Sequence, residues 1–381
     1  MPGVEKRVLI CTTVIRTVEA FLLPMIAQLR ESGVEVAVAS NLDESEVTEC
    51  VLLEVDQLIH IGLERKPLRP SYFAELRKMR SHLMSLRPGV VECHTPIASA
   101  LWRVAALMTP KEIRPRVIYF AHGFHFGSTE GTETWSRSAK LLARVERMLA
   151  KGTDHLVVIN ADDRRIAREV LEYPEQAITH LGGVGIPLSE YANPQSGAAD
   201  TKEPFHIAVV GGLLPNKRPF EALAAAQDFA TRYQVETKLT FAGDGPLMDE
   251  LRVAADSTEI TVEFLGRISD VRELLWRSDA LLFLSEREGL PRTVLEAVCA
   301  GLPVVAHDIR GVRDILTGQE WWFVPQDRSA ENVAIALAGA FEHDASAAAM
   351  VESLAPFSSE SVNQAHTDLV LEQLADRSLA T

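Results

Sequence analysis

The amino-acid sequence predicts an α/β protein made of two domains, each built on a parallel β-sheet. The chain has 381 residues, more than one hydrophobic core usually accommodates. Short apolar runs alternate with stretches of helical periodicity along the whole chain, which is typical of parallel strands joined by helices. A segment rich in Pro, Gly and small polar residues, 186–204, interrupts this alternation. We therefore expect two parallel-sheet halves facing a central cleft, where strand carboxyl ends bind ligands.

The elements follow from local runs of residues. We expect buried strands at 7–14, 35–40, 89–93, 116–121 and 155–160, and again at 206–211, 238–243, 261–265, 280–284 and 303–307. Apolar residues recur at helical spacing in 73–86, 140–150 and 220–233. These elements predict an N-terminal domain at 1–190 and a C-terminal domain at 204–356. A last helix at 357–381 is expected to pack back on the N-terminal domain.

Composition and charge narrow the class of protein. The net charge of −15 argues against a general nucleic-acid binder. The charge is uneven, because residues 1–195 carry a balance of −1 and residues 196–381 a balance of −14. The N-terminal half is therefore the better candidate to approach an anionic membrane surface.

The cysteines and the apolar runs bear on localisation. The four cysteines are far apart and form no CxxC pair, which fits a reduced, cytoplasmic compartment. No run of 18 or more apolar residues occurs, so we expect no membrane span. The first apolar run is too short for a signal peptide and is interpreted as a strand.

The segment 285–305 carries the strongest chemical signal. Glu288 begins a turn after the strand at 280–284, and a helix is expected from about Arg292. Backbone N–H groups at 289–293 would therefore lie at a helix N-terminus, which favours anions and polar ligand atoms. Glu296, about one turn into the helix, could accept hydrogen bonds from neighbouring sugar hydroxyls. The alternative is that both glutamates only cap the helix and pair with Arg292.

Two further segments follow predicted strands. Gly211 and Gly212 precede Lys217 and Arg218 without the spacing of a Walker loop. A lysine beside a glycine-rich strand end suits a diphosphate, which needs positive charge when it becomes a leaving group. His122, next to Gly123 after the strand at 116–121, is a candidate for contact with a ligand. A surface lysine and a structural histidine are the alternatives.

The spacing Glu288-x7-Glu296, embedded in Glu-Gly-Leu-Pro and Ala-Gly-Leu-Pro-Val-Val, resembles glycosyltransferase family 4. The resemblance implies the GT-B fold, with two Rossmann-like domains, and transfer with retention of anomeric configuration. It places Glu288 beside the donor sugar and Glu296 on the ribose hydroxyls. The turn of Gly289, Leu290 and Pro291 would offer N–H groups to the sugar and diphosphate.

The resemblance also implies roles for residues outside that helix. It assigns His122 to contact with the donor sugar and Lys217 to contact with the diphosphate. His122, Lys217 and Glu288 are the three residues expected to be catalytic. The family usually has an arginine where this sequence has Gly212, and we expect Arg218 to compensate. The remaining assignments are donor binding for Gly211, Gly212, Gly266 and Arg267, and contact with acceptor or phosphate for His125 and Thr13.

Other segments narrow the subfamily. Glu92-Cys-His-Thr-Pro-Ile-Ala-Ser99 and Ala121-His-Gly-Phe-His-Phe126 resemble bacterial enzymes that build capsule, exopolysaccharide and lipid-linked glycans. This resemblance implies a UDP-sugar donor, transfer of a hexosyl or N-acetylhexosaminyl group, and a lipid-linked saccharide acceptor. Basic residues interleaved with apolar ones, in 77–87 and 137–151, are consistent with membrane contact through the N-terminal, acceptor-side domain. We expect an enzyme on the inner face of the cell membrane.

The remaining expectations concern metals, cofactors and rival functions. No Asp-x-Asp occurs, so we expect a metal-independent reaction and no cofactor, the nucleotide sugar being a substrate. One rival is a UDP-sugar 2-epimerase of the same architecture, and another is a non-catalytic nucleotide-sugar-binding protein. A nicotinamide-dependent dehydrogenase is disfavoured because no GxGxxG follows a strand.

Overall fold

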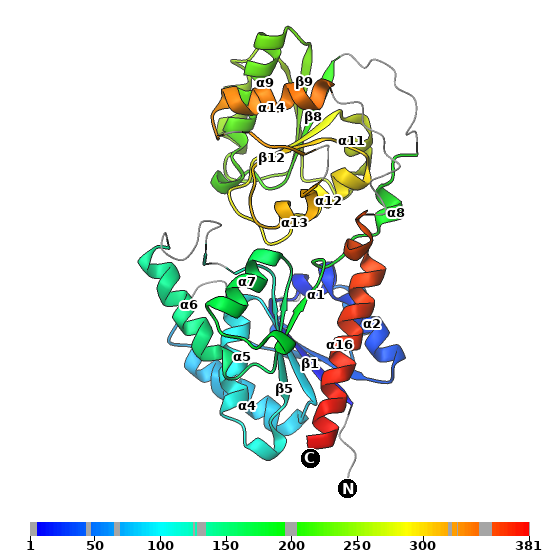
Figure 1. Cartoon of the computed structure of the whole chain (residues 1–381). Helices are drawn as coiled ribbons and strands as arrows, with labels where there is room; N and C mark the ends of the chain where they lie inside the picture. Colours follow the sequence, from blue (N-terminus) through cyan, green and yellow to red (C-terminus); the bar gives the residue numbers. More distant parts are fainter. Residues whose placement is uncertain are drawn as a thin grey trace. The chain divides into compact units, whose positions relative to one another are not determined.

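The computed structural model describes residues 6–42, 47–64, 69–124, 126–127, 135–194, 204–318, 322–325, 327–342 and 353–380. The chain forms two compact units (Figure 1). Unit 1 comprises Met1–Gly185 and Glu360–Thr381, and unit 2 comprises Ile186–Ser359. Each contains a parallel β-sheet with helices packed on it, so the predicted pair of parallel-sheet α/β units is confirmed.

Unit 1 has a seven-stranded sheet of order β3-β2-β1-β4-β5-β6-β7 with parallel pairings throughout. The five predicted strands form as β1 (Arg7–Val14), β2 (Glu35–Asn41), β4 (Val90–His94), β5 (Arg116–Ala121) and β6 (His155–Val158). The sequence did not predict β3 (Gln57–His60) and β7 (Ile178–His180), which form the two edges. These strands are three or four residues long and half exposed, so they lack a continuous apolar run.

The helices of unit 1 bury one apolar side against this sheet. They are α1 (Arg16–Phe21), α2 (Leu23–Glu31), α3 (Glu49–Glu54), α4 (Tyr72–Leu86), α5 (Pro96–Leu107), α6 (Arg137–Ala150), α7 (Ala161–Glu169) and the C-terminal α16 (Ser359–Ala380). Side chains cap two of them: Ser136 accepts from the N–H of Ala139 before α6, and Asn160 accepts from that of Asp163 before α7. Each cap satisfies an N–H group that has no partner within its helix.

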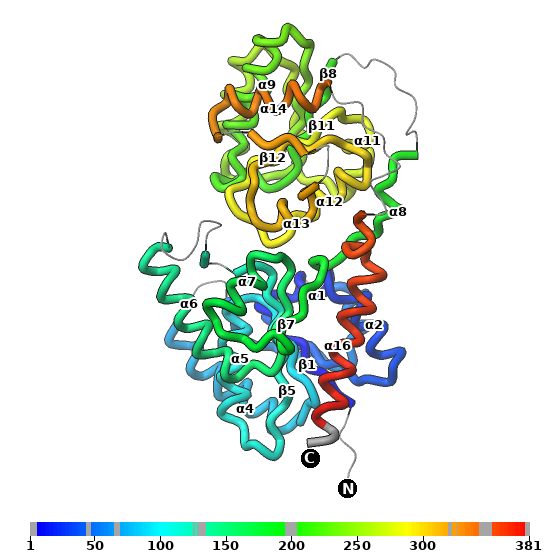
Figure 2. The backbone as a smooth tube through the Cα atoms, viewed as in Figure 1, coloured from blue at the N-terminus to red at the C-terminus, as the bar shows by residue number. Residues whose placement is uncertain are grey.

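The C-terminal helix α16 is part of unit 1 although unit 2 precedes it in the chain. Figures 1 and 2 show α16, in red, lying alongside α2, in blue. The Thr367 hydroxyl donates to the side chain of Gln28 on α2 at 2.9 Å. Arg116 on β5 donates twice to Gln373, at 2.6 and 2.9 Å. These polar contacts fix the position of α16 on the sheet.

Unit 2 has a six-stranded parallel sheet of order β10-β9-β8-β11-β12-β13. Its strands are β8 (Phe205–Val210), β9 (Thr237–Ala242), β10 (Thr261–Gly266), β11 (Ala280–Phe283), β12 (Val304–Ala306) and the unpredicted two-residue β13 (Trp322–Phe323). Its helices are α8 (Leu188–Tyr191), α9 (Pro219–Tyr233), α10 (Met248–Ala255), α11 (Arg272–Arg277), α12 (Arg292–Cys299), α13 (Val312–Leu316) and α14 (Ala330–Glu342). One apolar core involves α9 and α14, and another involves α12 and α13 (Figure 1).

The first part of the segment 186–204, which the sequence predicted to be a linker, is folded and packs into unit 2. Ile186 is fully buried in a core of unit 2, and α8 follows it and packs against α12. The N–H of Ile186 donates to Phe357, and the N–H of Ser359 donates back to Ile186. The compact units therefore divide after Gly185 rather than at 190, because apolar residues at 186–191 bury themselves in unit 2. Residues 195–203 lie outside the described residues.

The order of the strands determines where each unit can bind a ligand. In unit 2 the chain proceeds from β8 to β9 on one side and returns to β11 on the other. In unit 1 the same reversal separates β1 from β4. Loops that follow the two strands at such a reversal diverge and leave room for a ligand. The segments singled out in the sequence at 211–218 and 284–291 follow β8 and β11.

Candidate functional site

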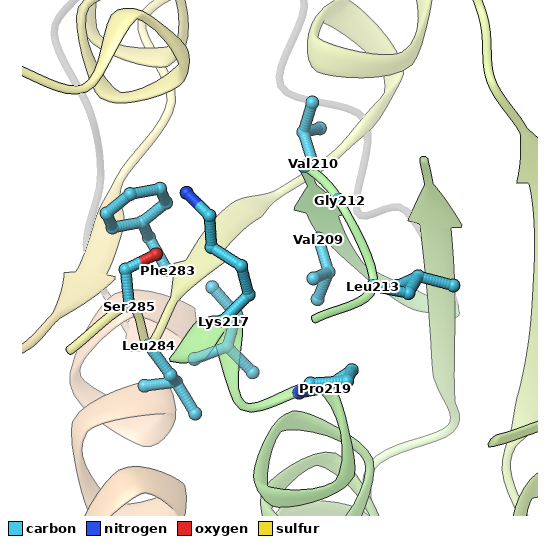
Figure 3. Close-up of a pocket in the computed structure, with 11 residues that line it drawn as sticks. Val209, Val210, Gly212, Leu213, Lys217, Pro219, Phe283, Leu284 and Ser285 are labelled. Carbon is cyan, nitrogen blue, oxygen red and sulfur yellow. The ribbon is translucent and has the colours of Figure 1, made fainter. Parts of the chain in front are cut away.

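A pocket in unit 2 lies at the carboxyl ends of β8 and β11 (Figure 3). Two stretches of chain and two further residues line it, namely 209–213, Lys217, Pro219 and 282–285. Figure 3 shows the Lys217 side chain extending toward Phe283 and Ser285, with the Gly212 loop on the other side. The loops after β8 and β11 therefore form one site, although about 70 residues separate them in sequence.

Glycine packing shapes the loop after β8. Gly211 has φ 145°, and Gly243 in the next loop has φ 156°. A Cβ on Gly243 would lie 1.8 Å from the carbonyl oxygen of Gly211, so no other residue fits there. The sequence placed Gly243 only at the end of an expected strand, with no part in the site. Packing does not require a glycine at position 212, because a Cβ there would meet no atom closer than 3.6 Å.

Lys217 and Glu288 meet at this pocket. Lys217 ends a short 3-10 helix, Pro215–Lys217, and its Nζ donates to Oε1 of Glu288. The Nζ also lies 5.7 Å from the centre of the Phe283 ring. The side chains of Lys217 and Glu288 are only 27% and 19% exposed, so solvent screens this ion pair less than an ion pair on the surface. The structure thus brings together two residues that the sequence assigned to one diphosphate-sugar site.

Arg218 points away from the pocket, toward two glutamates. Its backbone is left-handed, with φ 55°, and its guanidinium donates to Glu221 at 2.7 Å and to Glu286. Hydrogen bonding to Glu286 raises the pKa of Arg218. Arg218 is absent from the lining of the pocket. The two carboxylates therefore hold the guanidinium of Arg218, and its compensation for the absent arginine at Gly212 stays a prediction.

The turn of Gly289, Leu290 and Pro291 leads from β11 into α12. Pro291 precedes the first residue of α12, Arg292. Gly311, with φ 80°, packs behind the turn, where a Cβ would lie 2.3 Å from the carbonyl oxygen of Gly289. The backbone of this turn is therefore held by a direct contact with a second loop.

Glu296 lies on α12 and is only 8% exposed. Tyr191 of α8 donates its hydroxyl to Oε1 of Glu296 at 3.0 Å, and the guanidinium of Arg292 is 3.6 Å from the same oxygen. Burial raises the pKa of Glu296 despite both neighbours. Burial and the adjacent Glu296 raise the pKa of Tyr191 to about 12. The hydroxyl therefore remains a donor at neutral pH.

Tyr191 is a residue that sequence reasoning missed. It lies in the segment predicted as a linker, and the indole of Trp276 donates to its carbonyl at 2.8 Å. The sequence contained one indication of its burial. An aromatic residue that follows the apolar Ile186 and Leu188 within a few positions is unusual for a linker exposed to solvent.

Gly266 and Arg267 lie at the end of β10. Gly266 has φ 64°, and its carbonyl accepts from the N–H of Gly243 at 2.8 Å. Gly266 is thereby linked to the glycine loops beside the pocket. Arg267 is exposed to solvent. Neither residue lines the pocket after β8 and β11.

The two predicted residues of unit 1 that the structure describes lie within a strand of its sheet or directly after one. His122 comes directly after β5, and its Nε2 lies 3.0 Å from Nδ1 of His94. Burial and the neighbouring His94 lower the pKa of His122 to about 3, so this imidazole is neutral at physiological pH. Thr13 of β1 is buried, and its hydroxyl shares a hydrogen bond of 2.6 Å with that of Thr95. His125 lies outside the described residues.

Known proteins resemble this chain in both units. Residues 192–353 match the family model of glycosyl transferases group 1, and residues 16–182 match that of the glycosyl transferase 4-like domain. EpsD of Bacillus subtilis, a protein that is named a glycosyltransferase, is 30% identical over 329 residues, covering 84% of this chain and 83% of EpsD. The UDP-Gal:alpha-D-GlcNAc-diphosphoundecaprenol alpha-1,3-galactosyltransferase of Escherichia coli is 29% identical over 241 residues, 58% of each chain.

Solved structures share the fold. HepE of Anabaena, in complex with UDP and glucose, matches with a TM-score of 0.70 at 16% identity, covering 96% of this chain and 99% of HepE. The lipopolysaccharide outer core galactosyltransferase WaaB matches with a TM-score of 0.69, also at 16% identity, covering 96% of this chain and 99% of WaaB.

These matches and the two α/β units define the class of protein, a glycosyltransferase of the GT-B fold. Within that class the chain belongs to glycosyltransferase family 4, and the resemblance found in the sequence is confirmed.

The contact behind the 289–291 turn can be tested with two glycines of nearly equal φ. Gly311 and Gly318 have φ 80° and 81°, but a Cβ on Gly318 would meet nothing within 4 Å. Gly318→Ala should cost about 1–2 kcal/mol of unfolding free energy through backbone strain alone. Gly311→Ala should cost about 3 kcal/mol or more, because the clash with Gly289 adds to the strain. Urea denaturation measures both, and equal losses would show that the close contact does not constrain the turn.

Proposed function

We propose that this enzyme transfers a sugar from a UDP-sugar, with retention of configuration, to a lipid-linked saccharide during synthesis of a bacterial surface polysaccharide or glycan. The observation that carries the proposal is the half-buried pair of Lys217 and Glu288 at the pocket after β8 and β11. A cation and a carboxylate that meet at a glycine-rich strand end suit a ligand with both an anionic diphosphate and a hydroxylated sugar.

In the proposed site the donor diphosphate competes with Glu288 for Lys217. Lys217 supplies a compact positive charge, and the backbone N–H groups of Gly212, in the loop after β8, and of Leu290, in the turn after β11, add hydrogen-bond donors. Charge grows on the diphosphate as the bond to the sugar breaks, so these groups stabilise the transition state more than the ground state. Glu288, released from Lys217, can accept hydrogen bonds from sugar hydroxyls.

Glu296 is the proposed ribose ligand. An ionised carboxylate accepts about four hydrogen bonds, and Tyr191 supplies one to Oε1. The remaining acceptor positions suit two adjacent ribose hydroxyls. A UDP donor is supported by the names of two similar proteins, the E. coli UDP-Gal-dependent enzyme and HepE in complex with UDP and glucose.

The proposed reaction needs no side-chain base. The bond from the anomeric carbon to the diphosphate breaks, and the acceptor hydroxyl bonds to the same face of that carbon. Its proton passes to an oxygen of the departing diphosphate, so UDP leaves with the proton. His122, neutral because of its low pKa, serves as a hydrogen-bonding partner of the sugar rather than as an acid. No cofactor or metal ion is required by this sequence of steps.

The role of Lys217 can be tested by turnover. Lys217→Ala should slow release of UDP on the order of 100-fold, because the leaving diphosphate loses its cation. Lys238→Ala is the matched control, since Lys238 is also 27% exposed and paired with a glutamate, Glu263. The assay measures UDP release from UDP-glucose, UDP-galactose and their N-acetylamino forms, with N-acetylglucosaminyl-diphosphoundecaprenol as acceptor.

Near-normal turnover by the Lys217→Ala variant would remove the diphosphate assignment. Isomerisation of UDP-N-acetylglucosamine without acceptor would instead favour an epimerase, and binding of UDP without turnover would favour a non-catalytic protein. The anomeric configuration of the product, read by NMR, tests retention separately.

A lipid-linked acceptor requires the enzyme to reach a membrane surface. We propose that the exposed side of α6 in unit 1 makes this contact. None of the described helices is long and apolar enough to cross a membrane. On α6, however, four apolar side chains are exposed, with Leu141 60% and Met148 62% exposed. Exposed basic residues accompany them, namely Arg137, Lys140, Arg144, Arg147 and Lys151, of which Arg147 pairs with Glu172 of the same unit. A surface that is both apolar and basic suits the headgroup region of an anionic bilayer.

The opposite face of α6 is anchored. Glu146 receives two hydrogen bonds of 2.8 Å from the fully buried Arg103 of α5. Breaking such a buried pair is costly, so the exposed face of α6 keeps its orientation. The basic residues of α4 are engaged locally, since Lys78 pairs with Glu75 and Arg80 donates to the carbonyl of Met108. These contacts favour α6 over α4 as the membrane surface. We propose that the enzyme works at the cytoplasmic face of the cell membrane.

Vesicle sedimentation tests this surface. The chain should bind vesicles of phosphatidylcholine with phosphatidylglycerol more tightly than vesicles of phosphatidylcholine alone. Replacing Lys140 and Arg144 with Gln should weaken binding by about tenfold or more, since each basic residue contributes about 1 kcal/mol. The matched control replaces Arg164 and Arg165 of α7 with Gln. Unchanged binding of the α6 variant, or equal loss in the α7 variant, would contradict a role for α6.

A further inference from the structure

Tyr191 reaches the carboxylate that is proposed to bind the ribose. It is the last residue of α8 and belongs to unit 2, as does Glu296 on α12. Its hydroxyl donates to Oε1 of Glu296 at 3.0 Å. Leu188 and Tyr191 also pack against the apolar core to which Val294 and Leu295 of α12 contribute. The contact between the hydroxyl and the carboxylate therefore lies within one compact unit and depends on how α8 packs against α12.

Three contacts with α11 hold the end of α8 in place. The indole of Trp276 donates to the carbonyl of Tyr191 at 2.8 Å, and the side-chain amide of Asn193 donates to the carbonyl of Trp276 at 3.3 Å. The guanidinium of Arg272 donates to Glu190 at 3.2 Å. These contacts involve Tyr191 itself and residues on both sides of it in sequence. The position of the tyrosine is therefore set by the packing of unit 2.

The two oxygens of the Glu296 carboxylate have different surroundings. The hydroxyl of Tyr191 and the guanidinium of Arg292, 3.6 Å away, both lie at Oε1. Among the residues that the structure describes, none donates a hydrogen bond to Oε2. A hydrogen bond is directional, so the carboxylate cannot turn about its last bond without losing the one from Tyr191. Tyr191 therefore fixes Oε1 and leaves Oε2 to a ligand.

The groups around Glu296 act on its charge in opposite directions. Burial raises the pKa of Glu296, Arg292 and the hydrogen bond from Tyr191 lower it, and Asp270, which precedes α11, raises it. Cys299 of the same helix is a neutral thiol, because burial and the charge of Glu296 raise its pKa to about 12. A hydrogen bond donated to an ionised carboxylate stabilises the ionised form. Tyr191 thus opposes the effect of burial on Glu296.

We propose that Tyr191 is a positioning residue for nucleotide recognition, which holds Oε1 of Glu296 so that Oε2 of the ionised carboxylate accepts hydrogen bonds from the ribose hydroxyls of a nucleoside diphosphate. The ribose contact rests on the proposed function, whereas the hold of Tyr191 on Glu296 stands on the contacts of unit 2 alone. A hydrogen bond to an ionised acceptor is about twice as strong as one to a neutral acceptor. Tyr191 therefore increases the preference for a ribonucleotide over a 2′-deoxyribonucleotide.

The hold of Tyr191 on Glu296 can be measured without any ligand. A pH titration of the whole chain with ¹³Cδ-labelled glutamate reads the ionisation of the carboxyl groups by NMR, and the Glu296→Gln variant identifies the signal of Glu296. Tyr191→Phe removes only the hydroxyl and should raise the pKa of Glu296 further, because the ionised form loses a donor. The matched control is Tyr72→Phe, since Tyr72 of unit 1 also donates its hydroxyl, to the carbonyl of Glu64 at 2.8 Å.

The control variant Tyr72→Phe should leave the pKa of Glu296 unchanged. An unchanged pKa of Glu296 in Tyr191→Phe, or an equal rise in both variants, would overturn the proposal. This titration needs no nucleotide, so its failure is distinguishable from failure of the proposed function.

Calorimetric titration with UDP and 2′-deoxy-UDP tests the link to the ribose. Tyr191→Phe should reduce the preference for UDP by about threefold or more at neutral pH, a coupling of the size that residues in contact show. As the pH is lowered, the preference should disappear at a higher pH in Tyr191→Phe than in the wild type, because Glu296 takes up its proton earlier. In a Glu296→Gln background Tyr191→Phe should have no further effect, since the carboxylate is gone.

Two outcomes of this titration would count against the proposal in different ways. A preference for UDP that is unchanged or increased in Tyr191→Phe would show that the tyrosine does not position Glu296 for the ribose. Equal affinity of the wild type for both nucleotides would contradict the ribose contact itself, which belongs to the proposed function.

Discussion

The ion pair between Lys217 and Glu288 is the contact on which the site in unit 2 depends. It joins the loop after β8 to the loop after β11, the two strands between which the sheet reverses its order. Glycines make this meeting possible, because Gly243 lets the loop after β8 pass at a distance that no side chain would allow, and Gly311 holds the turn at 289–291. In the proposed function, the donor diphosphate replaces the carboxylate of Glu288 on Lys217. A small exchange of charge on a rigid backbone is therefore sufficient to form the proposed donor site.

Unit 1 uses a buried carboxylate in a different way. Glu92 stays paired with histidines inside the protein and has no exposed surface. Through His94, Glu92 is linked to the half-buried His122, whose Nε2 lies 3.0 Å from Nδ1 of His94. Both units thus place their chemistry just beyond the carboxyl ends of parallel strands, where backbone N–H groups and buried side chains can be held in fixed directions.

Local pattern in the sequence was sufficient for most of the fold. Strands such as β1 and β5 were predicted with their observed bounds, because their apolar runs are long and end sharply. The two-residue β13 has no such run and exists only because β12 lies beside it. That Lys217 and Glu288 belong to one site was predicted from the resemblance of their motifs to those of the family. The contact of Tyr191 with Glu296, and that of His366 with Glu92, join residues 105 and 274 positions apart and depend on how the helices pack. No local period or spacing encodes such pairs, so the sequence did not predict them.

The central claim is that unit 2 binds a nucleoside diphosphate with its ribose on Glu296 and its diphosphate on Lys217. Calorimetric titration of the whole chain with UDP, 2′-deoxy-UDP and uridine tests it most directly. The account predicts that UDP binds about tenfold or more tightly than 2′-deoxy-UDP, since one hydrogen bond to a carboxylate is lost, and that uridine binds more weakly than UDP. In Glu296→Ala the preference for UDP over 2′-deoxy-UDP should disappear. Equal affinity of the wild type for UDP and 2′-deoxy-UDP, or a preference that survives in Glu296→Ala, would contradict it.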